Sequence, residues 1–135
     1  MNDLSIEKRE RFWAEELSKP QGGSVTLVAV DDAGEVVGFV SGGAERTGEL
    51  GSDGELYAIY LLERVQRRGL GALMMKRLAR EFILRGFGSM AVWVLAENPF
   101  RKFYEALGGK FIRERLVERG GQEFAEVAYG WGLRP

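Results

Sequence analysis

The segment Gln66-Arg67-Arg68-Gly69-Leu70-Gly71 decides the fold, because it lies between a strand pattern and a helix pattern. The apolar run 56–62 precedes it, and the run 72–84, with helical periodicity, follows it. Two glycines at such a junction let the backbone approach a ligand closely. The opening turn of the helix then offers unpaired N–H groups to an anion. The guanidinium groups of Arg67 and Arg68 suit phosphate oxygens. The residues alone favour a phosphate-binding loop and an ordinary glycine-containing turn about equally.

Two familiar nucleotide-binding loops do not fit this segment. A P-loop needs Gly-Lys followed by Ser or Thr, whereas Gly71 is followed by Ala72 and Leu73. A dinucleotide fingerprint needs a third glycine, and Met74 occupies that position. The loop therefore belongs to neither class.

Composition predicts one globular domain spanning residues 1–135. A net charge of −1 argues against a general nucleic-acid binder. The sequence has no cysteine and no histidine, so a metal site is not expected and a thiol nucleophile is excluded. No apolar run is long enough to cross a membrane and no signal peptide is visible, so we expect a cytoplasmic protein.

The patterning along the chain predicts a mixed α/β sheet with crossovers around the two later helices. Helices are predicted from Asp3 or Ser5 to about Leu17, over 71–85 and over 98–107. Strands are predicted over 24–31, 35–42, 55–62, 89–95, 110–117 and 123–132.

Two motifs in this order resemble those of GNAT-type N-acetyltransferases. The segment 66–71 matches the Gln/Arg-x-x-Gly-x-Gly/Ala signature, and Ile59-Tyr60-Leu61 lies where that family has the end of a central strand. The segment 98–108 resembles the second motif, an asparagine followed by Phe-Tyr-x-x-x-Gly. The resemblance runs from about Leu4 to Trp131. It implies a central splayed sheet flanked by helices.

The resemblance also implies that acetyl-CoA is the cosubstrate, held mainly by backbone groups. The N–H groups of 66–71 would hold its pyrophosphate, and the strand around 59–61 would pair with its pantetheine arm. A backbone N–H near Leu61 would polarise the thioester carbonyl. Asn98 would bind the pantetheine region, its alternative role being a helix cap. The charges of Arg67, Arg68 and Lys102 would reach the 3′-phosphate or simply face solvent. The implied acetyl-CoA residues are Ile59, Tyr60, Leu61, Gln66, Arg67, Arg68, Gly69, Leu70, Gly71, Ala72, Asn98 and Lys102.

Catalysis on an amine needs a base, because deprotonating a lysine-like amine at pH 7 costs about 4.6 kcal/mol. Without histidine the candidates are carboxylates, and Glu55 lies where the histone-acetylating branch of the family places its glutamate. Its alternative is a solvent-facing strand residue. Tyr104 corresponds to the family's usual general acid, its alternative being a core tyrosine. Near the acceptor side we place three residues whose alternative role is structural packing, Tyr57, Trp93 and Glu97.

The sequence departs from the family at its start, where we expect the usual first strand and helix to be lacking. We expect the strand 24–31 to be an uncovered edge, so that either the sequence is a truncated gene product or a second copy covers the edge in a homodimer. The asparagine-to-tyrosine spacing of the second motif is also one residue shorter than the commonest form. The expected acceptor is a primary amine of a small molecule. A protein N-acetyltransferase and a non-catalytic CoA-binding module are the alternatives.

Overall fold

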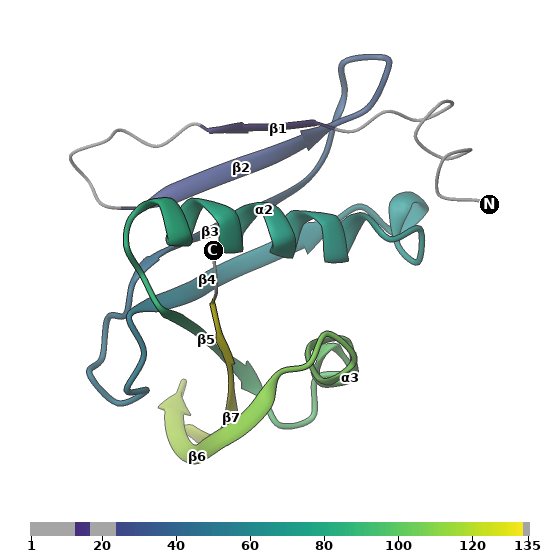
Figure 1. Ribbon diagram of the computed structural model, residues 1–135. Coiled ribbons are helices and arrows are strands. Elements are labelled where there is room, and N and C mark those ends of the chain that lie inside the picture. The colour runs from purple at the N-terminus through teal and green to yellow at the C-terminus, as the bar shows by residue number, and fades with distance from the viewer. Residues whose placement is uncertain (1–12, 17–23, 134–135) are drawn as a thin grey trace.

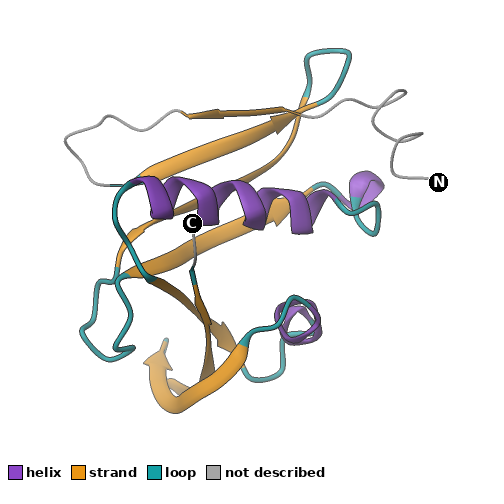
Figure 2. Cartoon of the chain, viewed as in Figure 1, coloured by secondary structure: helices purple, strands orange, loops and turns teal. Residues whose placement is uncertain are grey.

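The computed structural model describes residues 13–16 and 24–133, which form a mixed sheet with helices packed against it (Figures 1 and 2). The described part contains seven strands in the order β1-β2-β3-β4-β5-β7-β6. The strands are β1 Trp13–Glu16, β2 Val25–Val30, β3 Val36–Ala44, β4 Gly54–Leu61, β5 Ser89–Leu95, β6 Lys110–Arg119 and β7 Gln122–Gly132. The helices are the 3₁₀ turn η2 Glu63–Val65 and the α-helices α2 Leu70–Leu84 and α3 Phe100–Ala106.

The pairing of β4 with β5 is parallel, while the other neighbouring strands pair antiparallel. The crossover between β4 and β5 contains α2, which covers one face of the sheet (Figure 1). The buried residues of α2 recur every three to four positions and form its inward stripe. They are Leu70, Gly71, Met74, Met75, Leu78 and Phe82. Each large apolar side chain buried in this way contributes roughly 1.5–3 kcal/mol, so this stripe fixes the helix on the sheet.

Strands β4 and β5 stay together over a short distance only. Their register is Gly54↔Met90, Glu55↔Ala91 and Leu56↔Val92, whereas β4 continues to Leu61 and β5 to Leu95. Figure 1 shows the two strands diverging beyond this pairing. The prediction of a splayed central sheet is therefore confirmed.

A bulge in β4 lies at the point of divergence. Gly42 pairs with Leu56 and Ser41 with Ala58, so Tyr57 is an extra residue on β4. A bulge bends its strand and increases the local twist, and bulges are frequent beside active sites. The bulge thus helps to turn β4 away from β5.

The prediction for the start of the chain is wrong where it can be compared. Residues 13–16, expected in a helix, form β1, which pairs antiparallel with β2 from Trp13↔Val30 to Glu16↔Leu27. The open edge of β2 offers a row of N–H and C=O groups, and pairing with them outweighs the weak helical spacing of this segment. A first strand is therefore present, and β2 is not an uncovered edge. The rest of the predicted helix lies outside the described residues.

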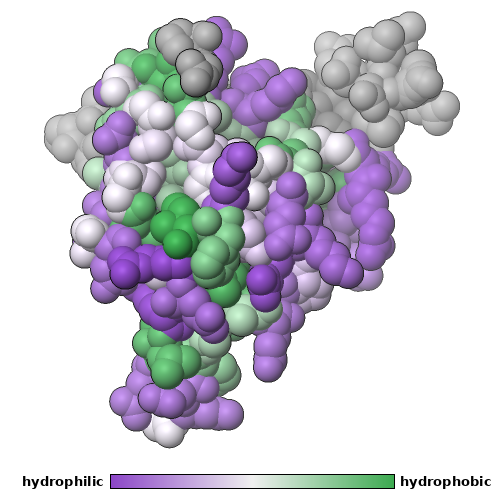
Figure 3. Space-filling model, turned by 60° about the horizontal axis from the view of Figure 1, so that its bottom comes forward, coloured by the Kyte–Doolittle hydropathy of each residue, from purple (hydrophilic) through white to green (hydrophobic). Residues whose placement is uncertain are grey.

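The other predicted elements agree with the structure to within about two residues, the usual uncertainty of element ends. The underside of the molecule carries mostly hydrophilic side chains, with apolar residues in small separate groups (Figure 3). Among the described residues, no helix has the length and apolar character needed to span a membrane.

Candidate active site

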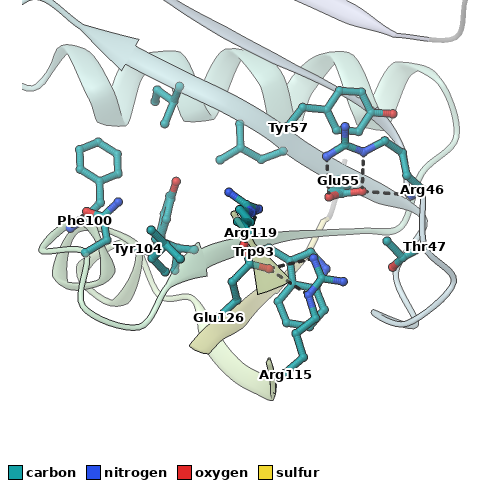
Figure 4. Close-up of a pocket in the computed structure, with 15 residues that line it drawn as sticks. Arg46, Thr47, Glu55, Tyr57, Trp93, Phe100, Tyr104, Arg115, Arg119 and Glu126 are labelled. Atoms are coloured by element: carbon teal, nitrogen blue, oxygen red, sulfur yellow. Dashed lines mark hydrogen bonds and ion pairs between the residues drawn. The ribbon is translucent and has the colours of Figure 1, made fainter. Parts of the chain in front are cut away.

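A cavity of about 460 Å³ lies where β4 and β5 diverge, and we call it the splay cavity (Figure 4). Its walls come from β4, β5, the β3–β4 loop, the start of α3 and the β6–β7 hairpin. Four of the predicted catalytic and acetyl-CoA-binding residues line it, namely Glu55, Ile59, Asn98 and Tyr104. Segments far apart in the sequence thus meet at one opening of the sheet.

Tyr104 reaches the splay cavity from α3, which begins with a capped turn. The Asn98 side-chain oxygen Oδ1 accepts a hydrogen bond of 2.8 Å from the backbone N–H of Phe100, so the helix-cap role expected as an alternative is present. The Tyr104 ring packs edge-on against Phe100 and Trp131, and only 4% of the residue is exposed. Burial raises the pKa of the Tyr104 phenol well above its ordinary value. The group is therefore both a core aromatic and a protonated phenol that lines the cavity.

Glu55 lies at the other end of the splay cavity and is 2% exposed, so the alternative of a solvent-facing residue is wrong. Arg46 donates three hydrogen bonds to its carboxylate: from the backbone N–H at 3.0 Å, from Nε at 3.3 Å and from Nη2 at 3.1 Å. The Arg46 guanidinium also lies 3.9 Å from the centre of the Tyr57 ring, a cation–π distance. Burial raises the pKa of Tyr57, whose hydroxyl donates to the carbonyl of Ala44 at 2.6 Å. At this end of the cavity, Glu55 and Arg46 form an ion pair, and the Arg46 guanidinium packs on the Tyr57 ring.

A second buried carboxylate, which sequence analysis missed, lines the same cavity. Glu126 on β7 is 6% exposed and accepts from Arg115 Nε at 2.9 Å and from Arg119 Nη2 at 3.2 Å. The Arg115 guanidinium lies 3.8 Å from the centre of the Trp93 ring. The sequence does contain a signal for this pairing, the two-residue turn Gly120-Gly121. A tight turn fixes the register of the hairpin, and this register places Arg115 opposite Glu126.

The predicted acceptor-side residues are only partly brought together. Tyr57 and Trp93 line the splay cavity, whereas Glu97 lines a neighbouring cavity with Gln122 and Glu123. The buried Trp93 Nε1 has no hydrogen-bond partner in the part of the chain that is described. Trp93 therefore retains an unused donor within this region of the molecule.

The predicted phosphate loop lies beyond the end of β4, outside the splay cavity. Arg67 and Gly69 both have left-handed backbones, with φ of 64° and 83°. The first hydrogen bond of α2 runs from the N–H of Leu73 to the carbonyl of Gly69, at 3.1 Å. The amides of 70–72 lie before this bond, so, like the opening amides of any helix, they have no partner within the helix. The loop is tied to the strand, because Gln66 Nε2 donates to the Leu61 carbonyl at 3.0 Å.

Close packing holds the start of α2 against α3. A Cβ atom on Gly71 would lie 3.1 Å from the Phe103 ring and 3.3 Å from Leu61. By contrast, a Cβ on Gly69 would meet nothing within 4 Å, so that glycine is needed for its φ and the space in front of it is open. The exposed loop and helix start thus have the form of an anion cradle.

The remaining predicted acetyl-CoA residues lie on both sides of β4 and on α3. Tyr60 is 54% exposed and packs on Phe39, with 6.1 Å between ring centres, while Leu61 is buried in the core. Lys102 is exposed on α3.

Comparison with known proteins identifies the class. The family described as FR47-like protein matches residues 36–118. The uncharacterised N-acetyltransferase YuaI of Bacillus subtilis strain 168 is 39% identical over 131 residues, which are 97% of this chain and 73% of YuaI. The chain belongs to the GNAT family of acetyl-CoA-dependent N-acetyltransferases.

Solved structures share the fold. The crystal structure of nourseothricin acetyltransferase superposes with a TM-score of 0.71 at 15% identity, over 93% of this chain and 85% of that one. YncA from Salmonella typhimurium, solved with its cofactor acetyl-CoA, gives a TM-score of 0.66 at 20% identity, over 83% and 66% of the two chains. At these identities the likeness concerns the fold.

Proposed function

We propose that this protein transfers the acetyl group of acetyl-CoA to the primary amine of a small molecule, by direct attack while both substrates are bound. The single observation that carries the proposal is the opening between β4 and β5, which has an anion cradle at one end and a cavity lined by Glu55 and Tyr104 at the other.

The residues present fit acetyl-CoA. Its pyrophosphate suits the amides of 66–71 and the open space at Gly69. The edge of β4 beyond Leu56, which β5 leaves, suits a pantetheine arm that adds like a strand. Asn98 and Lys102 lie on the α3 side, where they would contact the rest of the cofactor. Acetyl-CoA supplies the activated acetyl thioester, and the chain supplies the groups around it.

Tyr104 is the proposed proton donor for the departing thiolate. Burial raises the pKa of its phenol above the ordinary value, so the hydroxyl is protonated at neutral pH and can donate a hydrogen bond to the sulfur of the departing thiolate. The hydroxyl is directed into the cavity rather than into the aromatic cluster that holds the ring (Figure 4).

Glu55 is the proposed base, acting on the acceptor ammonium directly or through water. The three donors of Arg46 fix the position of its carboxylate, and a carboxylate retains further lone pairs for a proton relay. Holding amine and thioester together can supply roughly 7–11 kcal/mol, whereas one positioned proton transfer contributes about 10²–10⁴-fold, so most of the rate comes from positioning the two substrates.

The size of the splay cavity favours a small acceptor. Pockets for small molecules commonly span roughly 300–1,000 Å³, and this one of about 460 Å³ lies near the lower end of that range. A peptide acceptor would instead need a long groove along the sheet.

The test has two stages. Calorimetric titration with acetyl-CoA should show binding to one site per chain, and an amine panel should then show release of CoA thiol. Because the chain has no cysteine, a thiol-reactive dye reports only CoA. Failure to bind acetyl-CoA would refute the proposal, and binding without turnover of any amine would support the non-catalytic module instead.

A further inference from the structure

In the splay cavity, where the proposed function places the acceptor amine, positive side chains outnumber negative ones. Three arginines line it against two carboxylates, and all five are contributed by the β3–β4 loop, the start of β4 and the β6–β7 hairpin. These residues are Arg46, Arg115, Arg119, Glu55 and Glu126.

Both carboxylates are already satisfied by arginine. Glu55 accepts three hydrogen bonds from Arg46. Glu126 accepts from Arg115 Nε at 2.9 Å, forms an ion pair with Arg115 Nη2 at 2.8 Å, and accepts from Arg119 Nη2 at 3.2 Å. A substrate with a second ammonium group would therefore find no unpaired carboxylate in this cavity. A polyamine or other dication is disfavoured.

Arg119, in contrast, keeps most of its donors. A guanidinium has five N–H groups, and among the described residues Arg119 uses only Nη2, toward Glu126. Its side chain is 64% exposed, so the remaining fork is open to a ligand. In the view of Figure 4 the Arg119 side chain lies between Tyr104 and the Glu55–Arg46 pair, and all of these residues line the cavity.

The neighbouring arginine is fixed in position. Arg115 lies over Trp93 and is held by Glu126 and by Glu49, whose Oε1 accepts from Arg115 Nη1 at 2.9 Å. These contacts fix Glu126, and Glu126 in turn holds one edge of the Arg119 guanidinium. A guanidinium anchored on one edge presents its other edge as a planar fork, which matches the two oxygens of a carboxylate or phosphonate.

We infer that the acceptor is a small primary amine that also carries an oxyanion group, such as an amino acid or an aminophosphonate, and that Arg119 binds that group. The inference rests on the proposed function, and it names the class of acceptor within it. The anion at Arg119 would hold the molecule so that its amine can lie toward Glu55 and Tyr104, which line the same cavity.

The experiment compares matched acceptors that differ only in the anion. For each of a set of L-amino acids, kcat/KM is measured with saturating acetyl-CoA and compared with kcat/KM for the corresponding amide and for the corresponding decarboxylated amine. A separate arm of the experiment uses aminoalkylphosphonates. Binding of each acid to the complex with CoA is measured by calorimetry. We expect at least one acid or phosphonate to exceed its amide and amine by roughly tenfold or more, as a charge-assisted pair predicts. The two arms distinguish carboxylate from phosphonate.

Arg119→Gln is the informative variant, because Arg115 continues to hold Glu126 and no buried carboxylate is left unpaired. It should lower the ratio of kcat/KM for the acid to that for its amine by roughly tenfold, mainly through KM, while the dissociation constant for acetyl-CoA stays the same. Arg113→Gln, on the same strand but outside the cavity lining, is the control and should leave the ratio unchanged.

The possible outcomes are distinct. Equal kcat/KM for acids and their decarboxylated amines, or a ratio unaffected by Arg119→Gln, would overturn the inference and leave the acetyltransferase proposal standing. Absence of both binding and turnover for every acid and phosphonate would also overturn it. Failure to bind acetyl-CoA would remove both.

Discussion

The two ends of the opening between β4 and β5 are built in different ways. At the end proposed for the cofactor, which we call the cofactor end, the loop 66–71 and the start of α2 offer backbone amides, left-handed turns and open space at Gly69. At the end proposed for the acceptor amine, which we call the acceptor end, two buried carboxylates, Glu55 and Glu126, are held by arginines from other segments. The first end depends on main-chain geometry and the second on side-chain charge.

This difference explains what each end can recognise and tolerate. A backbone cradle binds a fixed group such as a diphosphate, and most of its side chains can vary, provided that the glycines remain. A buried carboxylate is sensitive to the loss of its last arginine partner, because that loss leaves an uncompensated charge. The acceptor end should therefore show the larger effects of polar substitution.

The largest effect is expected for Arg46→Gln, which removes two side-chain hydrogen bonds from the buried Glu55. Unfolding free energy measured in urea should fall by about 3 kcal/mol, near the low end for a broken buried pair because Arg46 is partly exposed. The double variant with Glu55→Gln should recover most of the loss. Arg119→Gln, which leaves Glu126 with Arg115, should cost much less. Similar losses in the two arginine variants would contradict this account of the acceptor end.

The next largest effect is expected for Tyr104→Phe, which removes the phenol from the cavity but keeps the ring in its aromatic cluster. We expect kcat to fall about 100-fold, as for loss of a general acid, with unchanged acetyl-CoA binding. Because the pKa of Tyr104 is raised above its ordinary 10.0, the wild-type kcat should show no loss from phenol ionisation as the pH rises toward 10. Full activity of the variant would remove Tyr104 from the mechanism.

The cofactor end should respond instead to added volume, as Gly71→Val would test. Its Cβ alone would lie 3.1 Å from the Phe103 ring, and the branched side chain would separate α2 from α3. Overpacking predicts a loss of about 1–3 kcal/mol in unfolding free energy and weaker acetyl-CoA binding by calorimetry. The control is Leu73→Val, which places the same side chain at an exposed position two residues further along α2. Equal stability of the two variants would show that this close approach is unimportant.

The smallest effect is expected at Asp31, the charged anchor near the cofactor end. Its carboxylate accepts the backbone N–H of Glu35 at 2.9 Å, and Arg64 donates to it at 3.2 Å; despite partial desolvation, these bonds lower the pKa of Asp31 below 3.8. Because the pKa is lower in the folded state, the ionised carboxylate stabilises the protein at pH values above the unfolded-state pKa. This stabilisation is lost as the pH falls through the folded-state pKa. Stability of the wild type should therefore decline below about pH 4, and Asp31→Asn should show a smaller decline. The test is to measure the free energy of unfolding in urea between pH 2 and 5 for the wild type and Asp31→Asn, with Glu118→Gln at an exposed position as the control. If wild type and Asp31→Asn lose stability in parallel as the pH falls, Asp31 does not stabilise the fold in this way.

Local patterns were sufficient for most of the fold. The alternation in 24–31 and 35–42, the helix after Gly69 and the capped turn at Asn98 all depend on neighbours in the chain, and the structure agrees with them. The first strand was missed, because β1 is four residues long and exists through its pairing with β2. A short strand carries little periodicity of its own, so only its partner defines it.

The candidate site divides in the same way. Sequence motifs alone indicated 66–71, Asn98 and Tyr104, since a cradle and a capped helix are local structures. The pairing of Glu55 with Arg46 spans nine positions, and that of Arg115 with Glu126 spans eleven. Long-range geometry also determined which charges are buried and which donors of Arg119 stay open.

The sequence by itself determined the family, the strand-loop-helix cradle and the aromatic helix that carries Tyr104, because each is specified by residues within a few positions of one another. Only the tertiary structure decided where β4 leaves β5, how deep Glu55 and Glu126 lie, and which arginines meet them. Burial and ion pairing depend on the folded sheet bringing distant segments together, which no local pattern records.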